Sequence, residues 1–183
     1  CLTEVGFVYA LHTEPTTADT KINVTASLGT FTNTVSGLRG NRTYYVRTYA
    51  VNSNGVVNYG NEVSFTTQKY TLTITAATGH TKVYGTADPV FNFTSLGFAN
   101  GDTNAIITGL LSRDAGENVG KYNIKLGSIS AGADYTIVFN GAEFEITKAN
   151  QTITWNQTLE FGCTDSNTVT LTATADSGVP VSY

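Results

Sequence analysis

The chain has 183 residues, of which 40% are hydrophobic, 11% are aromatic and 13% are charged, and its net charge is −4. The aromatic content argues against disorder, and the scattered lysines and arginines form no basic stripe that would bind nucleic acid. No apolar run reaches the roughly 18 residues of a membrane span, so membrane attachment and any export signal are expected only in regions outside this chain.

Residues 1–67 are expected to form a first β-module. Asn54 and Gly55 both tolerate positive φ, which predicts a tight turn between the runs 43–52 and 61–67 and therefore a hairpin. Apolar residues that alternate with a period of two indicate further strands with one buried face. Two such sets are Val5, Phe7, Tyr9 and Leu11, and then Ile22, Val24 and Ala26.

The run 43–52 presents two different faces. Tyr44 belongs to one face, and the other carries Tyr45, Arg47 and Tyr49. Rigid aromatic rings beside an arginine could hold an external glycan or protein, which makes this second face the candidate ligand-binding face. Aromatic residues two positions apart on a strand also serve as cross-strand packing partners, so packing against an adjacent strand or module is the alternative.

The spacing of Leu38 and Tyr44 is that of a tyrosine corner, in which a tyrosine hydroxyl ties the turn before a strand back to the backbone. Together with the 43–50 run Thr-Tyr-Tyr-Val-Arg-Thr-Tyr-Ala and Tyr59-Gly60, the corner resembles a fibronectin type III domain of Bacteroidetes surface proteins. Gly40 stands where that family usually has proline. The family's first two strands have no counterpart here, so this module is expected to be N-terminally truncated.

Residues 68–148 are expected to form a complete second module. The alternation of Leu72 with Ile74, and of Phe144 with Ile146, predicts antiparallel strands with one buried face. Asp102 is a suitable N-cap for one short helix near 102–108. The predicted fold is therefore mainly β, with modules that are either β-sandwiches or β-grasp-like.

The same module carries a recognisable set of motifs. These are the segment Lys82-Val-Tyr-Gly-Thr-Ala-Asp-Pro, the segment Gly101-Asp-Thr, and Leu111-Ser-Arg followed by Gly116-Glu-Asn-Val-Gly-Lys-Tyr. They resemble the MBG-type repeat of bacterial surface proteins. The resemblance implies extracellular display and a spacer or adhesive role, and it brings no catalytic residues.

Residues 149–183 are expected to begin a third β-module. Ile153 and Trp155 share a face, and Ser177-Gly178 predicts a turn. The segments Gln151-Thr-Ile-Thr-Trp and 171–183 resemble the opening strands of a bacterial immunoglobulin-like repeat. Further alternating residues are Val169, Leu171 and Ala173, and then Val179, Val181 and Tyr183.

The cysteines and histidines form no recognisable reactive site. Cys1 and Cys163 fall in different predicted modules, so two separate thiols are favoured over a disulfide. His12 and His80 show neither the spacing of a zinc site nor a serine or cysteine partner, and both are expected to be ordinary loop residues. We expect no cofactor and no metal.

The acidic residues also favour a structural role. Asp114 and Glu117, with Asn118, could bind Ca²⁺ through oxygen ligands, but the segment lacks the spacing of a calcium loop. A turn in which the Asp and Asn side chains cap their own backbone is favoured, and Asp134 is likewise expected to be a turn residue. Glycoside hydrolysis needs two carboxylates flanking the scissile bond, and the acidic residues are expected in turns or on outer strand faces.

The sequence therefore predicts a non-catalytic, modular segment of a bacterial cell-surface or secreted protein. Its expected role is that of a stalk, spacer or adhesion module. The alternatives are a glycan- or protein-binding module and an accessory region of a secreted carbohydrate-active enzyme. The expected partner is a host or environmental glycan or protein, and nucleic acid is not expected.

Overall fold

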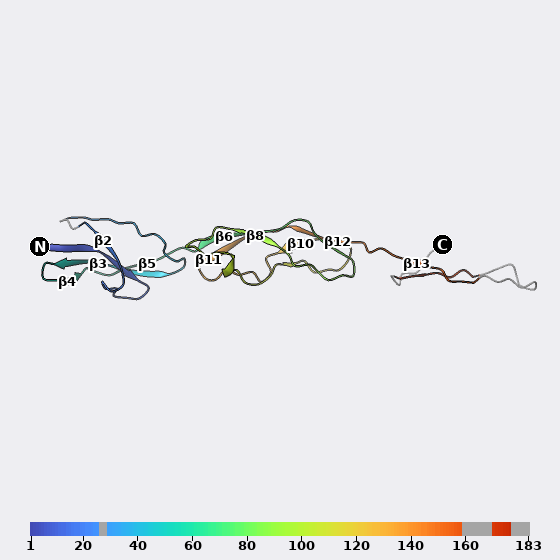
Figure 1. Ribbon diagram of the computed structural model, residues 1–183, viewed down its shortest axis with the longest axis horizontal. Helices are drawn as coiled ribbons and strands as arrows, with labels where there is room; N and C mark the ends of the chain where they lie inside the picture. Colours follow the sequence, from blue (N-terminus) through green and yellow to red (C-terminus); the bar gives the residue numbers. More distant parts are fainter. Residues whose placement is uncertain (26–28, 159–169, 177–183) are drawn as a thin grey trace, which may run out of the picture.

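The computed structural model describes residues 1–25, 29–158 and 170–176. Within them the structure is mainly β, as predicted, and its one helical element is a single 3₁₀ turn. Figure 1 shows the first module, the middle module and the C-terminal segment following one another along the long axis. No helix in the described part of the chain is long and apolar enough to cross a membrane.

The first module is one antiparallel sheet built around two long strands, β1 (Leu2–Ala10) and β3 (Thr43–Asn52). The short strand β2 (Thr20–Val24) pairs with β1, while β4 (Val57–Tyr59) and β5 (Val63–Thr66) both pair with β3. The predicted hairpin is confirmed, with Gly55 at a φ of 79° in its turn. The predicted second run, 61–67, contains β5, and the second arm also includes β4, which lies before that run.

The predicted strand at Ile22 is confirmed as far as Val24, where β2 ends, and Ala26 lies outside the described residues. The residue that links the two parts of the second arm lies close to β3. A Cβ on Gly60, between β4 and β5, would lie 2.2 Å from the Thr48 hydroxyl oxygen, so the chain passes β3 there at very close range.

The middle module consists of two small sheets. One has the order β11–β6–β8, made of β11 (Tyr135–Asn140), β6 (Tyr70–Ala76) and β8 (Phe93–Leu96). The other has the order β7–β12–β10–β9, made of β7 (His80–Val83), β12 (Glu143–Thr147), β10 (Gly120–Lys125) and β9 (Ser112–Arg113).

The expectation of purely antiparallel pairing in this module is wrong. β6 pairs with β11 in parallel, and β7 pairs with β12 in parallel. The reason is that β6 leads into β7 and β11 leads into β12, so the two chain segments run in the same direction from the first sheet to the second. Alternation along a strand reports which face is buried, and it carries no information on the direction of the neighbouring strand.

The faces themselves were predicted correctly. Leu72 and Ile74 from one sheet, and Phe144 and Ile146 from the other, are completely buried. They belong to a core that draws on residues 70–146 and contains none of the described residues of the first module. The predicted module boundaries at 68 and 149 stay predictions.

The predicted helical turn exists, but its cap is different. The 3₁₀ turn η1 (Asn104–Ile106) is capped by Thr103, whose hydroxyl accepts from the Ala105 N–H, and Asp102 as N-cap is wrong. The Asp102 carboxylate instead accepts a 2.8 Å hydrogen bond from the hydroxyl of Tyr135, a buried core residue. A partner from another element therefore overrides the local capping preference.

The C-terminal segment contains two short paired strands, β13 (Ile153–Thr154) and β14 (Thr174–Ala175). Trp155 follows β13 and is exposed. The predicted alternation at Val169 and at 179–183, and the predicted turn at Ser177-Gly178, lie outside the described residues.

Candidate functional site

Tyr45, Arg47 and Tyr49 share one face of β3, and the register of β1 explains how Tyr49 is held there. Tyr49 lies opposite Gly6, which has no side chain, so the ring packs over the β1 backbone and is 2% exposed. Its hydroxyl lies 2.5 Å from Glu4 Oε1 and 2.6 Å from Asn23 Oδ1. Burial, followed by the hydrogen bond to Glu4, raises the pKa of Tyr49.

The other two side chains of this face differ in their surroundings. The Arg47 guanidinium lies 4.6 Å from the centre of the Tyr59 ring, and Arg47 Nε donates to the Gly60 carbonyl at 3.3 Å. Tyr45 is half-buried. Tyr49 is thus enclosed within its own module and presents no surface to an external ligand. A ligand-binding role of Tyr45 and Arg47 stays a prediction.

The tyrosine corner is confirmed. Tyr44 is 7% exposed, and its hydroxyl accepts a 3.0 Å hydrogen bond from the Arg39 N–H. Thr67, just after β5, holds the same turn from its other end, because its hydroxyl donates to the Arg39 carbonyl at 2.6 Å and accepts from the Arg42 N–H at 3.1 Å. The turn at residues 38–42 is therefore fixed to its own sheet.

This turn faces the middle module and carries two arginines toward one buried carboxylate. Arg39 Nη1 donates to Asp134 Oδ2 at 3.1 Å. Arg42 Nη2 lies 2.8 Å from Asp134 Oδ1 as an ion pair outside hydrogen-bonding geometry. Asp134 occupies the predicted turn before β11, and the sequence reasoning missed that it pairs with the first module.

Three further contacts close this junction. The Tyr70 hydroxyl donates to the Leu38 carbonyl, and Asn100 Nδ2 donates to the same oxygen at 3.2 Å. A Cβ on Gly40 would lie 2.6 Å from the Asp134 carbonyl oxygen and 3.2 Å from the Tyr70 ring. The close approach of the two modules therefore accounts for glycine at this position, where the resemblance leads one to expect proline.

The motif residues of the middle module meet in a second site, which we call the charged cluster: Lys82, Asp88, Arg113 and Glu117. Lys82 Nζ lies 2.7 Å from Asp88 and 2.5 Å from Glu117. Arg113 contacts the same two carboxylates at 2.6 and 2.5 Å. The two cationic side chains are nearly buried, with 4% and 7% of their surfaces exposed, so the cluster forms a closed network of two positive and two negative charges.

The surroundings keep all four groups ionised at neutral pH. The Arg113 guanidinium lies 5.1 Å from the ring centres of Tyr122 and Phe144, which places it against the core. Its hydrogen bonds, with those of Lys82, lower the pKa of Asp88 to about 2. Lys82 and then Arg113 lower the pKa of Glu117, while Asp88 and Glu117 raise the pKa of Lys82. Carboxylates held in this way are poor proton donors near neutral pH.

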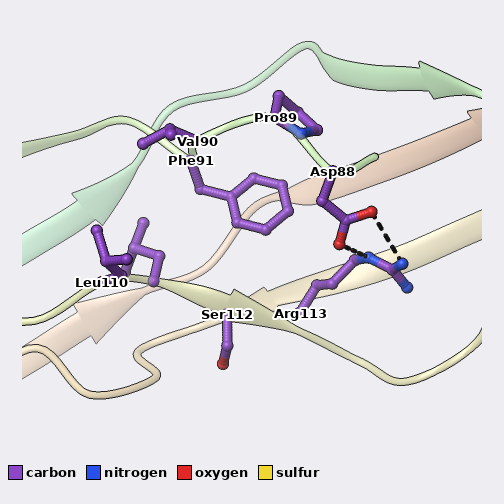
Figure 2. A pocket seen from close by; sticks show the side chains of 8 residues that line it. Asp88, Pro89, Val90, Phe91, Leu110, Ser112 and Arg113 are labelled. Atoms are coloured by element: carbon purple, nitrogen blue, oxygen red, sulfur yellow. Dashed lines mark hydrogen bonds and ion pairs between the residues drawn. The ribbon is translucent and has the colours of Figure 1, made fainter. Parts of the chain in front are cut away.

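A cleft of about 390 Å³ borders the cluster between residues 88–91 and 110–113. Figure 2 shows the Phe91 ring projecting between the two segments, with the Asp88–Arg113 pair at one end. Phe91 is buried, whereas Val90 and Leu110 are exposed. The cleft thus offers apolar contact, and the charges at its end are already paired.

The remaining candidate residues have structural contacts. His12 is exposed and its Nε2 lies 3.0 Å from Asp19 Oδ1. The expectation that His80 is a loop residue is wrong, because His80 begins β7 and its Nε2 accepts a 3.2 Å hydrogen bond from the Asn92 N–H. Among residues 1–25, 29–158 and 170–176, no three His, Cys, Asp or Glu side chains gather as a metal site. Cys1 is exposed with a free thiol, and Cys163 lies outside the described residues.

Asp114 differs from the expectation that it caps its own backbone. Its Oδ2 accepts from the backbone N–H and the side-chain amide of Asn123 at 3.2 and 3.1 Å, and its other oxygen pairs with Lys125. Both partners lie on the neighbouring strand β10, so this carboxylate links β9 to the sheet instead of capping a turn.

Comparison with known protein families gives a match within the middle module. Residues 72–145 match the family model described as MBG domain (YGX type), a bacterial surface-repeat type. The matched span contains the whole charged cluster and Asp134. No curated protein and no solved structure matches the chain. The resemblances of the first module to fibronectin type III and of the last segment to immunoglobulin-like repeats stay predictions.

Proposed function

We propose that this chain is a non-catalytic segment of a bacterial cell-surface or secreted protein and acts as a stalk or spacer. The observation that carries the proposal is the end-to-end succession of modules in Figure 1, with a surface-repeat match in the middle. Modules joined at their ends gain length with each unit, which is the property that a stalk requires. The match to a bacterial surface-repeat type supports an extracellular location.

The absence of enzymatic activity is part of the same proposal. In the charged cluster, each carboxylate is engaged by Lys82 and Arg113. A glycosidase needs one carboxyl group that can protonate a leaving group, with a raised pKa. The pKa values of Asp88 and Glu117 are lowered, which is the opposite direction.

The spacer role can be tested on living cells. Residues 1–183 are placed between a surface anchor and a fluorescent reporter domain, and the height of the reporter above the membrane is measured. The control replaces them with a Gly/Ser linker of equal residue number, which is a random coil whose reach grows only with the square root of its length. We expect the reporter to stand farther out on residues 1–183. Equal heights would contradict the spacer role.

The second candidate function is adhesion to a glycan or protein. Exposed aromatic side chains support it, since Trp155 and Tyr84 are both more than half exposed and could stack on a sugar ring. A glycan array and a mucin-binding screen would test it, with Tyr45→Ala for the predicted face and Tyr84→Ala as the matched change on the middle module. Binding that is lost only in Tyr45→Ala would support the predicted face, and binding unaffected by it would remove that face.

A further inference from the structure

We infer that the turn at residues 38–42 is a docking surface for the middle module, and that the two modules are locked into one rigid unit. We call this set of contacts the interdomain clamp; it joins Leu38, Arg39 and Arg42 of the first module to Tyr70, Asn100 and Asp134 of the second. The inference concerns the mechanical state of the chain and holds whether or not the chain is displayed on a cell.

Asp134 depends on the first module for its charge pairing. Its side chain is 11% exposed, and the cations within ion-pair distance of it are Arg39 and Arg42. In the docked chain both arginines compensate this enclosed carboxylate, as a buried charge requires. Separating the modules would break both ion pairs at once, so this charge pairing favours the docked orientation.

The interdomain clamp is anchored on both sides. On the first module, Tyr44 and Thr67 hold the turn that carries the arginines. On the second, the Asp134 carbonyl accepts a 2.9 Å hydrogen bond from the Tyr70 N–H, which continues the pairing of β6 with β11. Contacts between two fixed elements restrict orientation, whereas contacts between mobile loops would not.

The loop that carries Asn100 is also fixed. The Tyr135 hydroxyl accepts from the Ala99 N–H at 3.0 Å and contacts Asp102, so the core of the middle module holds both sides of Asn100. Asn100 has a φ of 55°, a left-handed conformation that asparagine tolerates better than most residues. Its amide is thereby presented to the Leu38 carbonyl.

Steric contacts also restrict how the two modules can be oriented. The connection between the modules is only Gln68-Lys69, and Gly40 lies where any side chain would meet the Asp134 carbonyl. A short connection and a contact with no spare room leave few alternative orientations. Two different kinds of interaction, charge pairing and close packing, thus favour the same arrangement.

The test is ¹⁵N relaxation of the full chain, which reports how each module tumbles. In the unaltered chain we expect the amides of 1–67 and of 70–147 to fit one common diffusion tensor. In Asp134→Asn combined with Tyr70→Phe, which removes the carboxylate charge and the hydroxyl but keeps both shapes, we expect two separate tensors. Arg39→Gln with Arg42→Gln should give the same result from the other module.

The matched control is Lys121→Gln, which breaks an exposed ion pair with Glu143 on the same module. It should leave one common tensor. Dispersed amide spectra confirm that each variant module is folded. If the Asp134 variant does not fold, the arginine variant tests the same clamp from the first module. Separate tumbling in the unaltered chain, or common tumbling in both sets of clamp variants, would overturn the inference.

Discussion

The hydroxyl of Tyr44 connects β3 to the turn that precedes it, and its removal should be measurable. Tyr44→Phe leaves the Arg39 N–H without its 3.0 Å partner but keeps the ring against Tyr9 and Phe65. We expect the free energy of unfolding of the first module to fall by about 1 kcal/mol, the net value of one hydrogen bond. Amide hydrogen exchange in β1 and β3 measures it.

Tyr45→Phe is the control for this change, because it removes a hydroxyl from the opposite face of the same strand. It should have a smaller effect than Tyr44→Phe. Equal losses in the two variants would mean that the corner hydrogen bond does not contribute to stability.

The charged cluster should make the middle module sensitive to acid. The folded-state pKa of Asp88 is about 2, below the ordinary value of about 4 for an aspartate. Its ionised form is therefore favoured by folding, and the stability it contributes is present above about pH 4 and lost as the pH falls toward 2. Asp88→Asn should unfold at a lower temperature at neutral pH and should lose less stability over that pH range.

Thermal unfolding followed through the amide signals of β10 and β12 from pH 7 to pH 2 tests this prediction. Glu117 also titrates with a lowered pKa, so the variant should retain part of the acid sensitivity. If the unaltered chain and Asp88→Asn lose stability in parallel between pH 4 and pH 2, then Asp88 is not linked to folding.

Two glycines in loops between strands allow the energetic cost of backbone strain to be compared with the cost of close packing. Gly127 and Gly79 both have positive φ, 61° and 81°, but their surroundings differ. A Cβ on Gly127 would lie 2.4 Å from the Leu110 carbonyl oxygen, whereas a Cβ on Gly79 would have no atom within 4 Å. Gly79→Ala should destabilise the module by roughly 1–2 kcal/mol through its φ alone.

Gly127→Ala should cost clearly more than Gly79→Ala, because it also pushes away the segment that leads into β9. Urea denaturation of the two variants, monitored by the same amide signals, provides the comparison. Equal costs would show that the approach of Gly127 to Leu110 is not tight in solution.

The elements show which parts of the fold the sequence could predict. Alternation predicted the buried faces of β6 and β12 correctly, because a side chain's face follows directly from its position in a strand. It could not predict that β6 pairs in parallel with β11, because that depends on the path of the intervening 58 residues, from 77 to 134. Likewise, the expectation that Asp102 is an N-cap used only its local sequence. The Tyr135 hydroxyl that binds its carboxylate instead comes from a distant strand.

At the level of the whole molecule, the interdomain clamp could not be predicted from the sequence, because it also joins residues that are far apart in the chain. Arg39 and Asp134 are 95 positions apart, and each has an ordinary local explanation as a turn residue. One indication was present, since Gly40 replaced the expected proline in a turn. A glycine without need of positive φ often marks close backbone approach, and here it marks the surface on which the next module docks.

The modules follow one another end to end, which makes the chain an extended segment. Small-angle X-ray scattering of residues 1–183 tests it most directly, because the pair-distance distribution depends on overall dimensions and not on local structure. We expect an asymmetric distribution, with a peak at the width of one module and a long tail toward the summed length of the modules. A single symmetric peak, typical of modules folded back against one another, would contradict it.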